Sequence, residues 1–321
     1  MKARAQVLTG PEEFELRELD VPDPGPGELR MRVHACGICG SDKVLAQVAP
    51  AGTVLGHEVV AEVEARGPGV RDWQVGERGI PIGDHLGMGE DGRSGGFSDL
   101  ILVSADSCVR VPRALPSLEA VLAEPLGNGL HFVGRGRLHA GQRVAILGAG
   151  QIGLSILYWA RRFGAGRIVV SEPTPARAQL ARELGADVVL DPSSQESMGK
   201  TITEALGGRP EIVFEATGRP AVMRDAVRMV GGGGGVVVLS GITLEEIAIR
   251  PASLCLKETD LVFPLGTVKE EVEEVVAVLA GREFPAERFI SHRIEQAAIP
   301  AALRDLGAPR DQIKVVVDYI G

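Results

Sequence analysis

The chain has 321 residues, 45% apolar and 24% charged, which is the composition of an ordinary globular protein with one large domain or two of medium size. Its net charge of −9 argues against nucleic acid or an anionic membrane surface as a partner, because both favour a basic face. No apolar run approaches the ~20 residues of a membrane span, and the N-terminal stretch lacks the apolar core of a signal peptide, so we expect a cytoplasmic protein.

The first ~120 residues predict short strands separated by turns rich in glycine and proline. Within them the stretch "HACGICGSD" holds Cys36 and Cys39. A reducing compartment disfavours a disulfide, and because Cys108 and Cys255 stand alone we do not expect a four-cysteine zinc knuckle. The preceding "ELRMRVHA" predicts a strand and the following residues a loop, which argues against a redox pair at the start of a helix. The remaining hypothesis is a single metal ligand completed by residues far along the chain.

Candidate partners for such a ligand follow in two short motifs. "LGHEVV" places His57 and Glu58 just downstream, the histidine 18 residues after Cys39. "LAEPLGNGL" places Glu124 near the point where short strands and turns give way to alternating strands and helices. Cysteine, histidine and carboxylate with an open fourth position form a catalytic zinc set rather than a structural one. We expect Asp42 to hold the second ring nitrogen of His57. Taken singly, each of these residues is equally explained as a structural histidine or an ordinary carboxylate.

From Arg143 to Gly266 apolar strands alternate with helices, which predicts a parallel sheet covered on both faces. The expected strands lie in "RVAILGAG", "RIVVSEP", "DVVLDP", "EIVFEATG", "GVVVLSG" and "LVFPLG". Between the first two, "QIGLSILYWARRFGA" predicts a helix whose buried face carries Ile152, Ile156, Ala160 and Phe163. The tail after Thr267 predicts two helices and a final strand, "IKVVVDY".

The stretch "VAILGAGQIG" predicts a dinucleotide site, because its G-x-G-x-x-G pattern follows a strand and opens a helix. Such glycines let the backbone approach a pyrophosphate at the helix N-terminus. Glu172 ends the second strand 19 residues after Gly153, where a carboxylate binds a ribose 2′-hydroxyl and repels a 2′-phosphate, which favours NAD over NADP. Arg177 is the opposing signal, since a nearby arginine serves a phosphate. The predicted cofactor contacts are Gly148, Gly150, Gln151, Ile152, Gly153, Glu172 and Arg177.

The motifs "GICGSD", "GHE", "EPL", "GAGQIG" and "EATG", in this order along nearly the whole chain, resemble those of the zinc-dependent medium-chain alcohol and polyol dehydrogenases. The stretch "VVSEPTPARAQLARELGADVVLDP" is similar to the NAD-linked butanediol and sorbitol branch. The resemblance implies an α/β protein with a GroES-like β-rich catalytic domain, residues 1–124 and 267–321, and a doubly wound Rossmann NAD-binding domain, residues 125–266.

The resemblance also implies site roles. It puts zinc on Cys39, His57 and Glu124, with Glu58 as a neighbouring carboxylate that approaches the metal during turnover. Ser41 becomes the hydroxyl that takes the alcohol proton, so the catalytic set is Cys39, Ser41, His57 and Glu58. Cys36 is expected to be a small buried apolar residue of its strand.

Two departures from the family refine these expectations. The four-cysteine structural zinc lobe is absent from "IGDHLGMGEDGRSGGFSDL", so we expect one catalytic zinc per chain and no structural zinc. The relay histidine common shortly after "SD" is replaced by Lys43, Val44 and Leu45, so the outer proton path is altered or runs through water. We expect His131 to be either structural or close to the metal site, and the remaining histidines, His34, His85, His139 and His292, to be structural or on the surface.

The expected activity is hydride transfer between NAD and a secondary alcohol, diol or polyol, or its ketone. The alternatives are a zinc-free quinone-reductase-like enzyme of the same fold and a non-catalytic dinucleotide-binding protein. We expect a homodimer or homotetramer joined through "GITLEEIAIRP" at the far end of the Rossmann sheet, a segment that is otherwise an ordinary edge strand guarded by Glu245 and Glu246.

Overall fold

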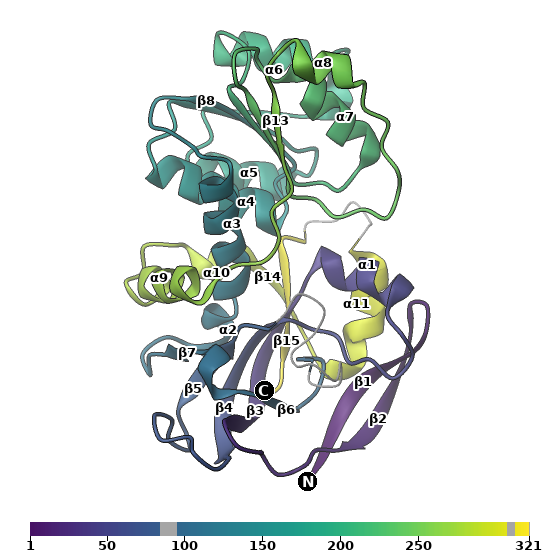
Figure 1. The fold of residues 1–321 in the computed structure, drawn as a ribbon, viewed down its shortest axis with the longest axis vertical. Helices are drawn as coiled ribbons and strands as arrows, with labels where there is room; N and C mark the ends of the chain where they lie inside the picture. The colour runs from purple at the N-terminus through teal and green to yellow at the C-terminus, as the bar shows by residue number, and fades with distance from the viewer. Residues whose placement is uncertain (84–94, 307–311, 321) are drawn as a thin grey trace. The chain divides into compact units, whose positions relative to one another are not determined.

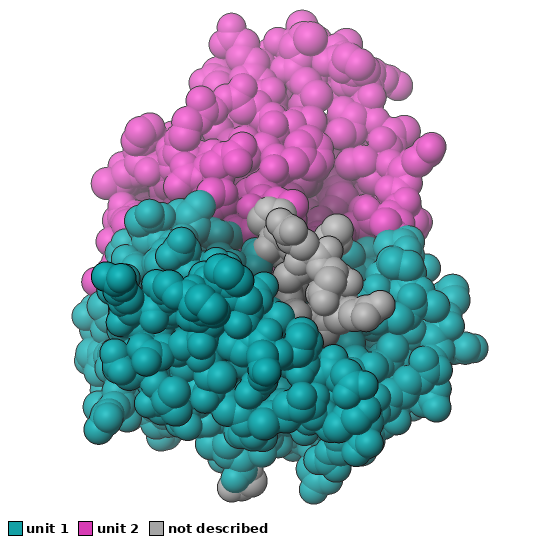
Figure 2. Space-filling view, turned by 60° about the horizontal axis from the view of Figure 1, so that its bottom comes forward, with its two compact units in different colours: residues 1–127, 267–308, 314–321 teal, residues 128–266, 309–313 magenta. Residues whose placement is uncertain are grey.

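The computed structural model of the chain describes residues 1–83, 95–306 and 312–320. These residues form two compact units, coloured separately in Figure 2. Unit 1 comprises residues 1–127, 267–308 and 314–321, and unit 2 comprises residues 128–266 and 309–313. No helix among the described residues is long and apolar enough to cross a membrane.

Unit 2 is built on a six-stranded parallel sheet with the order β10-β9-β8-β11-β12-β13. Figure 1 shows the fold, with β8 and β13 of this sheet labelled. The central strands are apolar on both faces and buried, as expected for a parallel sheet covered by helices. The order reverses direction at β8 and β11, which makes the carboxyl ends of these two strands the switch point where doubly wound folds bind dinucleotides. The strands are β8 (Arg143–Leu147), β9 (Arg167–Ser171), β10 (Val188–Leu190), β11 (Ile212–Glu215), β12 (Val236–Leu239) and β13 (Asp260–Val262).

The crossover segments of unit 2 contain α4 (Gln151–Arg162), α5 (Pro175–Glu183), α6 (Met198–Leu206), α7 (Pro220–Met229) and α8 (Pro251–Cys255). In α4, Ile156 and Ala160 are fully buried as expected, whereas Phe163 is 40% exposed and Ile152 is half-buried. Leu154, Leu157 and Trp159 are also buried, so the helix is covered on more sides than a single stripe.

Unit 1 is built around β3 (Glu28–Ile38), which pairs antiparallel with β4 (Glu58–Arg66), β6 (Leu100–Ser104) and β15 (Lys314–Asp318). The sheet continues through β5 (Arg78–Pro81) and β7 (Cys108–Val111) on one side and β14 (Ile290–Ile294) on the other. A separate ribbon joins β1 (Lys2–Gly10) to β2 (Glu13–Asp20). The helices of the unit are α1 (Gly40–Val48), α2 (Ser117–Ala120), α9 (Lys269–Ala280), α10 (Ala286–Phe289) and α11 (Ile299–Asp305), while α3 (Ala123–Arg135) begins here and ends in unit 2.

Three local expectations are corrected by the structure. The residues after Cys39 form α1 rather than a loop, with Cys39 as the residue that caps its N-terminus. The segment "GITLEEIAIRP" is irregular over residues 241–250, so the edge strand of the sheet is β13 instead. "LVFPLG" contributes only Leu261 and Val262 to that strand, which begins at Asp260. Most of the short loop expected in place of a zinc lobe, together with His85, lies outside the described residues.

Candidate metal centre and nucleotide site

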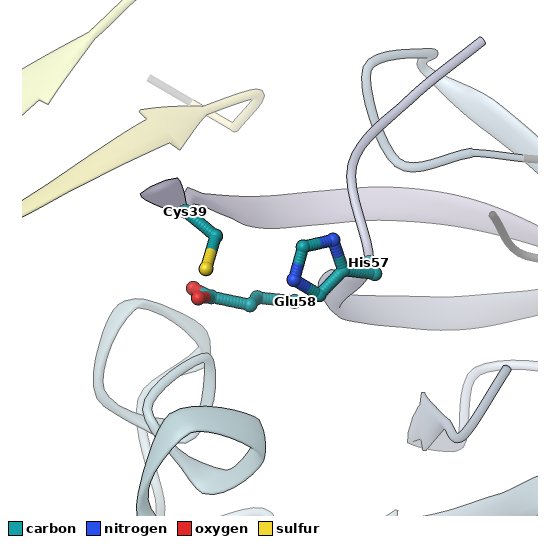
Figure 3. A group of neighbouring side chains, drawn as sticks. All are labelled: Cys39, His57 and Glu58. Atoms are coloured by element: carbon teal, nitrogen blue, oxygen red, sulfur yellow. The ribbon is translucent and has the colours of Figure 1, made fainter. Parts of the chain in front are cut away.

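The metal candidates gather where β3 ends and β4 begins. Potential ligand atoms of Cys39, His57 and Glu58 all lie within 4.8 Å of one another, and Figure 3 shows the three side chains grouped together. Bonds of about 2.0–2.3 Å from zinc to nitrogen, oxygen and sulfur bring tetrahedral ligands to comparable separations. A thiolate, an imidazole and a carboxylate therefore fit a catalytic zinc ion in both chemistry and spacing.

Adjacent residues on one strand point to opposite faces, which would have kept His57 and Glu58 apart. The structure avoids this because β4 starts at Glu58, so His57 lies in the irregular segment before the strand. Both side chains then join the same group. This local break in the strand is what makes Glu58 a candidate ligand.

Asp42 orients two members of the group. Its Oδ1 lies 3.1 Å from Nδ1 of His57, as expected from the sequence, and its Oδ2 accepts a hydrogen bond of 2.9 Å from the backbone N–H of Cys39. With Nδ1–H donated to Asp42, Nε2 is left as the ring's electron-pair donor. Ser41 Oγ lies 3.3 Å from this Nε2, so the hydroxyl expected to move the substrate proton borders the metal group.

The surroundings of His57 raise its pKa. Burial lowers the pKa of His57, but the charge and hydrogen bond of Asp42, together with Cys39, raise it by more, so the pKa lies well above its ordinary value. Cys36 differs from Cys39: it is fully buried in the core, and burial is the largest cause that raises the pKa of its thiol. The expectation that Cys36 is a buried apolar residue is confirmed.

Glu58 has a buried cationic partner that the sequence analysis missed. Lys314, on β15, forms an ion pair with Oε2 of Glu58, and both side chains are 0% exposed. Its ammonium also donates to the carbonyl oxygen of Ile38, at 3.0 Å. Gly37 leaves space for this ion pair, because a Cβ there would lie 1.8 Å from Glu58 Oε2 and 2.7 Å from Lys314 Nζ. A lone lysine at the start of an apolar strand was the only signal in the sequence.

Glu124 lies in the first turn of α3 and is half-buried. It is not a member of the group formed by Cys39, His57 and Glu58. The ligand role that the resemblance implies for Glu124 remains a prediction, as does a role for His131 further along the same helix.

The nucleotide motif has the backbone geometry that its glycines predict. Gly148 has a φ of +94°, a conformation that favours glycine, and Gly150 caps the N-terminus of α4. A Cβ on Gly153 would lie 1.9 Å from the carbonyl oxygen of Gly148, so only glycine lets helix and loop approach this closely. Gln151 and Ile152 form the first turn of α4, the position that contacts a bound pyrophosphate in such folds.

Glu172 follows β9 and is 5% exposed. One carboxylate oxygen accepts from the backbone N–H of Ala149 in the glycine-rich loop at 2.7 Å, and the other from that of Thr174 at 2.9 Å. A carboxylate has further lone pairs, so it still has acceptor capacity for a ribose hydroxyl. Arg177 donates through Nε to the carbonyl oxygen of Gln312 at 2.6 Å, which anchors its guanidinium to the C-terminal segment.

Comparisons with known proteins identify the family to which the chain belongs. Residues 25–113 match the alcohol dehydrogenase GroES-like domain, and residues 152–281 match the zinc-binding dehydrogenase domain. The chain is 30% identical to sorbitol dehydrogenase from Homo sapiens, in a match that covers 79% of this chain and 79% of that relative. The chain belongs to the zinc-dependent medium-chain alcohol and polyol dehydrogenases.

Other members of this dehydrogenase family match almost end to end. (R,R)-Butanediol dehydrogenase from Bacillus subtilis is 28% identical, covering 95% of this chain and 96% of the relative. The crystal structure of 2R,3R-butanediol dehydrogenase from the same species superposes with a TM-score of 0.85 at 27% identity, over 98% and 99% of the two chains. The crystal structure of a zinc-binding dehydrogenase from Sinorhizobium meliloti 1021, bound to NADP, superposes with a TM-score of 0.87 at 27% identity, over 99% of each chain. The predicted family, fold and zinc-type dehydrogenase class are confirmed.

Proposed function

We propose that this dehydrogenase transfers hydride between NAD and a secondary alcohol, diol or polyol, with one zinc ion per chain. The observation that carries the proposal is the group of Cys39, His57 and Glu58 beside Asp42 and Ser41, in a chain that also has the glycine-rich loop. Relatives named butanediol and sorbitol dehydrogenases support a substrate with neighbouring hydroxyl groups.

Cys39 and His57 are the proposed permanent zinc ligands, and two carboxylates compete for the third position. Glu58 is favoured by its distance to the other two ligands, while Glu124 is favoured by the family motif. We propose Glu58 as the third ligand at rest, through the oxygen that does not form the ion pair with Lys314. This reverses the order of preference expected from the sequence.

When bound, zinc supplies a Lewis acid that acidifies the alcohol hydroxyl. The chain's own residues do the rest. Asp42 fixes the imidazole of His57 through Nδ1, and Ser41 accepts the hydroxyl proton and passes it outward to water, since no histidine follows "SD". A bound nicotinamide cofactor would supply the hydride acceptor for the carbinol carbon, so that the alcohol would become a ketone as NAD became NADH. The glycine-rich loop and Glu172 bind the dinucleotide.

The test combines metal analysis with steady-state kinetics. Protein purified without added zinc is expected to hold one tightly bound zinc per chain, and a panel of diols, polyols and simple secondary alcohols, run with NAD and NADP, is expected to give turnover with a diol or polyol and NAD. Chelation should abolish turnover and zinc should restore it. Two tightly bound zinc ions would contradict the stoichiometry, and no turnover with any alcohol or ketone would favour the non-catalytic alternative.

We further propose a cytoplasmic homo-oligomer, supported by four free cysteines and the exposed edge of unit 2.

A further inference from the structure

The last residue of β11, Glu215, is a fully buried carboxylate to which the proposed chemistry assigns no task. It stands in register with Leu147 of β8 on one side and with Leu239 of β12 on the other. Leu147 is followed directly by Gly148, so Glu215 lies level with the start of the glycine-rich loop, at the switch point of the sheet.

Both oxygens of this carboxylate hold the loop that follows β11. Oε1 accepts from the backbone N–H of Thr217, at 2.8 Å, and from its hydroxyl, while Oε2 accepts from the N–H of Gly218 at 3.4 Å. Burial is the largest cause of a raised pKa at Glu215, and these donors together with Arg219 oppose it. A buried carboxylate is costly unless it is hydrogen-bonded, so the loop supplies the compensation.

The same residue joins this loop to the one that follows β12. The backbone oxygen of Glu215 accepts from the N–H groups of Ser240, at 2.8 Å, and Gly241, at 3.0 Å. A Cβ on Gly241 would lie 2.0 Å from the nitrogen of Gly218 and 2.8 Å from Oε2 of Glu215. The two loops therefore touch backbone to backbone, with Glu215 at the junction.

The loop after β11 also packs on the glycine-rich loop. A Cβ on Gly148 would lie 2.7 Å from Cγ2 of Thr217, and one on Gly153 would lie 3.6 Å from the Cβ of Ala216. A displaced residue 216 or 217 would thus disturb the wall of the dinucleotide site itself.

Glu172 gives the matching arrangement on the other side of the switch point. Glu172 comes directly after β9, whereas Glu215 is the last residue of β11, and both carboxylates are buried and accept from the backbone N–H two residues on. A dinucleotide lies across the crevice with its pyrophosphate at β8, and Glu172 at β9 marks the adenosine half. The ends of β11 and β12 then border the nicotinamide half.

We propose that Glu215 is a positioning residue that shapes the loops following β11 and β12 for the nicotinamide half of the cofactor. This rests on the nicotinamide cofactor of the proposed function. Glu215 acts through Thr217, Gly218 and Gly241 rather than by touching the reacting atoms.

The experiment compares Glu215→Gln with Glu211→Gln, a matched change just before the opposite end of the same strand, where the side chain pairs with Arg143 at the surface. Dissociation constants are measured by calorimetry for NADH, or NADPH if the unmodified protein prefers it, and for ADP, which lacks the nicotinamide half. Because the glutamine amide cannot accept from Gly218, Glu215→Gln should bind NADH about tenfold more weakly, the effect of about one lost hydrogen bond to a charged group. ADP binding should stay unchanged, and Glu211→Gln should match the unmodified protein for both.

A second variant keeps the proposal testable if Glu215→Gln does not fold. Gly241→Ala keeps residue 215 as glutamate, but its new methyl group would displace Gly218 and crowd the Glu215 carboxylate, so it should also weaken NADH binding and leave ADP binding unchanged. Unchanged NADH binding in both variants, or equal weakening of NADH and ADP, would overturn the proposal. If the unmodified protein bound neither NADH nor NADPH, the proposed cofactor would fail as well, which is a distinct result.

Discussion

At the scale of single residues, the metal group depends on two carboxylates with different surroundings. Glu58 is fully buried and forms an ion pair with Lys314, whereas Glu124 is half-buried at the start of α3. A ligand oxygen contributes directly to metal binding, while a neighbouring group acts only by orienting ligands, which typically changes affinity by about 10–100-fold.

We therefore expect Glu58→Gln to weaken zinc binding by more than about 100-fold and Glu124→Gln by less than that, measured by competition with a fluorescent zinc chelator on metal-free protein. Cys39→Ser serves as the reference for loss of a true ligand. The reverse order, with Glu124→Gln the weaker binder, would restore the assignment implied by the sequence motif.

Lys314 gives a stability prediction at the same site. Replacing it by Met leaves the Glu58 carboxylate buried without its cation, and breaking a buried ion pair in this way costs about 3–5 kcal/mol of unfolding free energy. Chemical denaturation of metal-free protein measures the loss. The double variant Lys314→Met/Glu58→Gln should recover part of it, because no lone charge remains. A Lys314→Met protein as stable as the unmodified one would show that the ion pair is unimportant.

Glu172 gives a prediction for the choice between NAD and NADP. Its removal in Glu172→Ser deletes a negative charge and frees the N–H groups of Ala149 and Thr174 to face a 2′-phosphate. The ratio of kcat/KM for NADP to that for NAD should therefore rise about tenfold or more. Glu204→Ser, an exposed change on α6, is the control. If the unmodified enzyme already used NADP as well as NAD, Arg177 would be the dominant group.

At the scale of elements, the order of strands and helices in unit 2 was predictable because near-continuous apolar runs and glycine turns mark parallel strands. The helix α1 was not, since "GICGSD" has the composition of a turn, and Asp42 stabilises it by bonding the N–H of Cys39. The partner of Glu58 was equally hidden. Lys314 lies 256 residues away in sequence, and only the pairing of β15 with β3 brings it to the site.

A polar cluster ties three elements of unit 1 together. Nδ1 of His34 on β3 lies 3.2 Å from Oγ of Ser117 at the start of α2, and the same oxygen accepts from Arg78 on β5 at 2.8 Å. Arg78 also donates to the carbonyl oxygens of Pro112, Arg113 and Leu115. Burial, followed by the charges of Arg78 and Arg32, lowers the pKa of His34 below the ordinary 6.5, and Glu62 opposes this.

The sign of the pH dependence follows. Because the pKa is lower in the folded chain, the unfolded chain binds the proton first, so the contribution of His34 is complete above pH 6.5 and is lost as the pH falls through the folded pKa. The fall in Tm between pH 7.5 and 5.5 should be smaller by about 2–4 °C in His34→Gln. The Tm of His292→Gln, a change at an exposed histidine on β14, should fall over this pH range by as much as that of the unmodified protein. Identical slopes for all three proteins would remove His34 from the acid response.

At the scale of the whole molecule, the outer edge of the unit 2 sheet suggests how copies associate. Within residues 128–266, no strand pairs with the free side of β13. Large apolar side chains are exposed near it: Leu256 at 88%, Phe263 at 64% and Leu265 at 54%. An unpaired edge with apolar neighbours is a template for pairing with a second strand.

We expect a homodimer or homotetramer in solution, formed through β13 rather than through residues 241–250. Phe263→Asp should weaken the association, since it buries a charge in the interface, whereas Phe163→Asp at the end of α4 should leave it unchanged. Light scattering at micromolar concentration gives the mass of each protein. A monomeric unmodified protein would refute the oligomer, and an unaffected Phe263→Asp protein would move the interface elsewhere.

The path of the chain through unit 1 has a consequence for biosynthesis. The ribosome completes nearly all of unit 2 before it reaches β14 and β15, and domains generally fold as they are made. The strand that carries Cys36 and the strand that begins at Glu58 are translated early, but their neighbour β15 arrives last, and with it the ammonium group for Glu58. The carboxylate of Glu58 therefore has no ammonium partner until the C-terminal strand has been made, although β3 and β4, which bring Cys39, His57 and Glu58 together, are both complete long before.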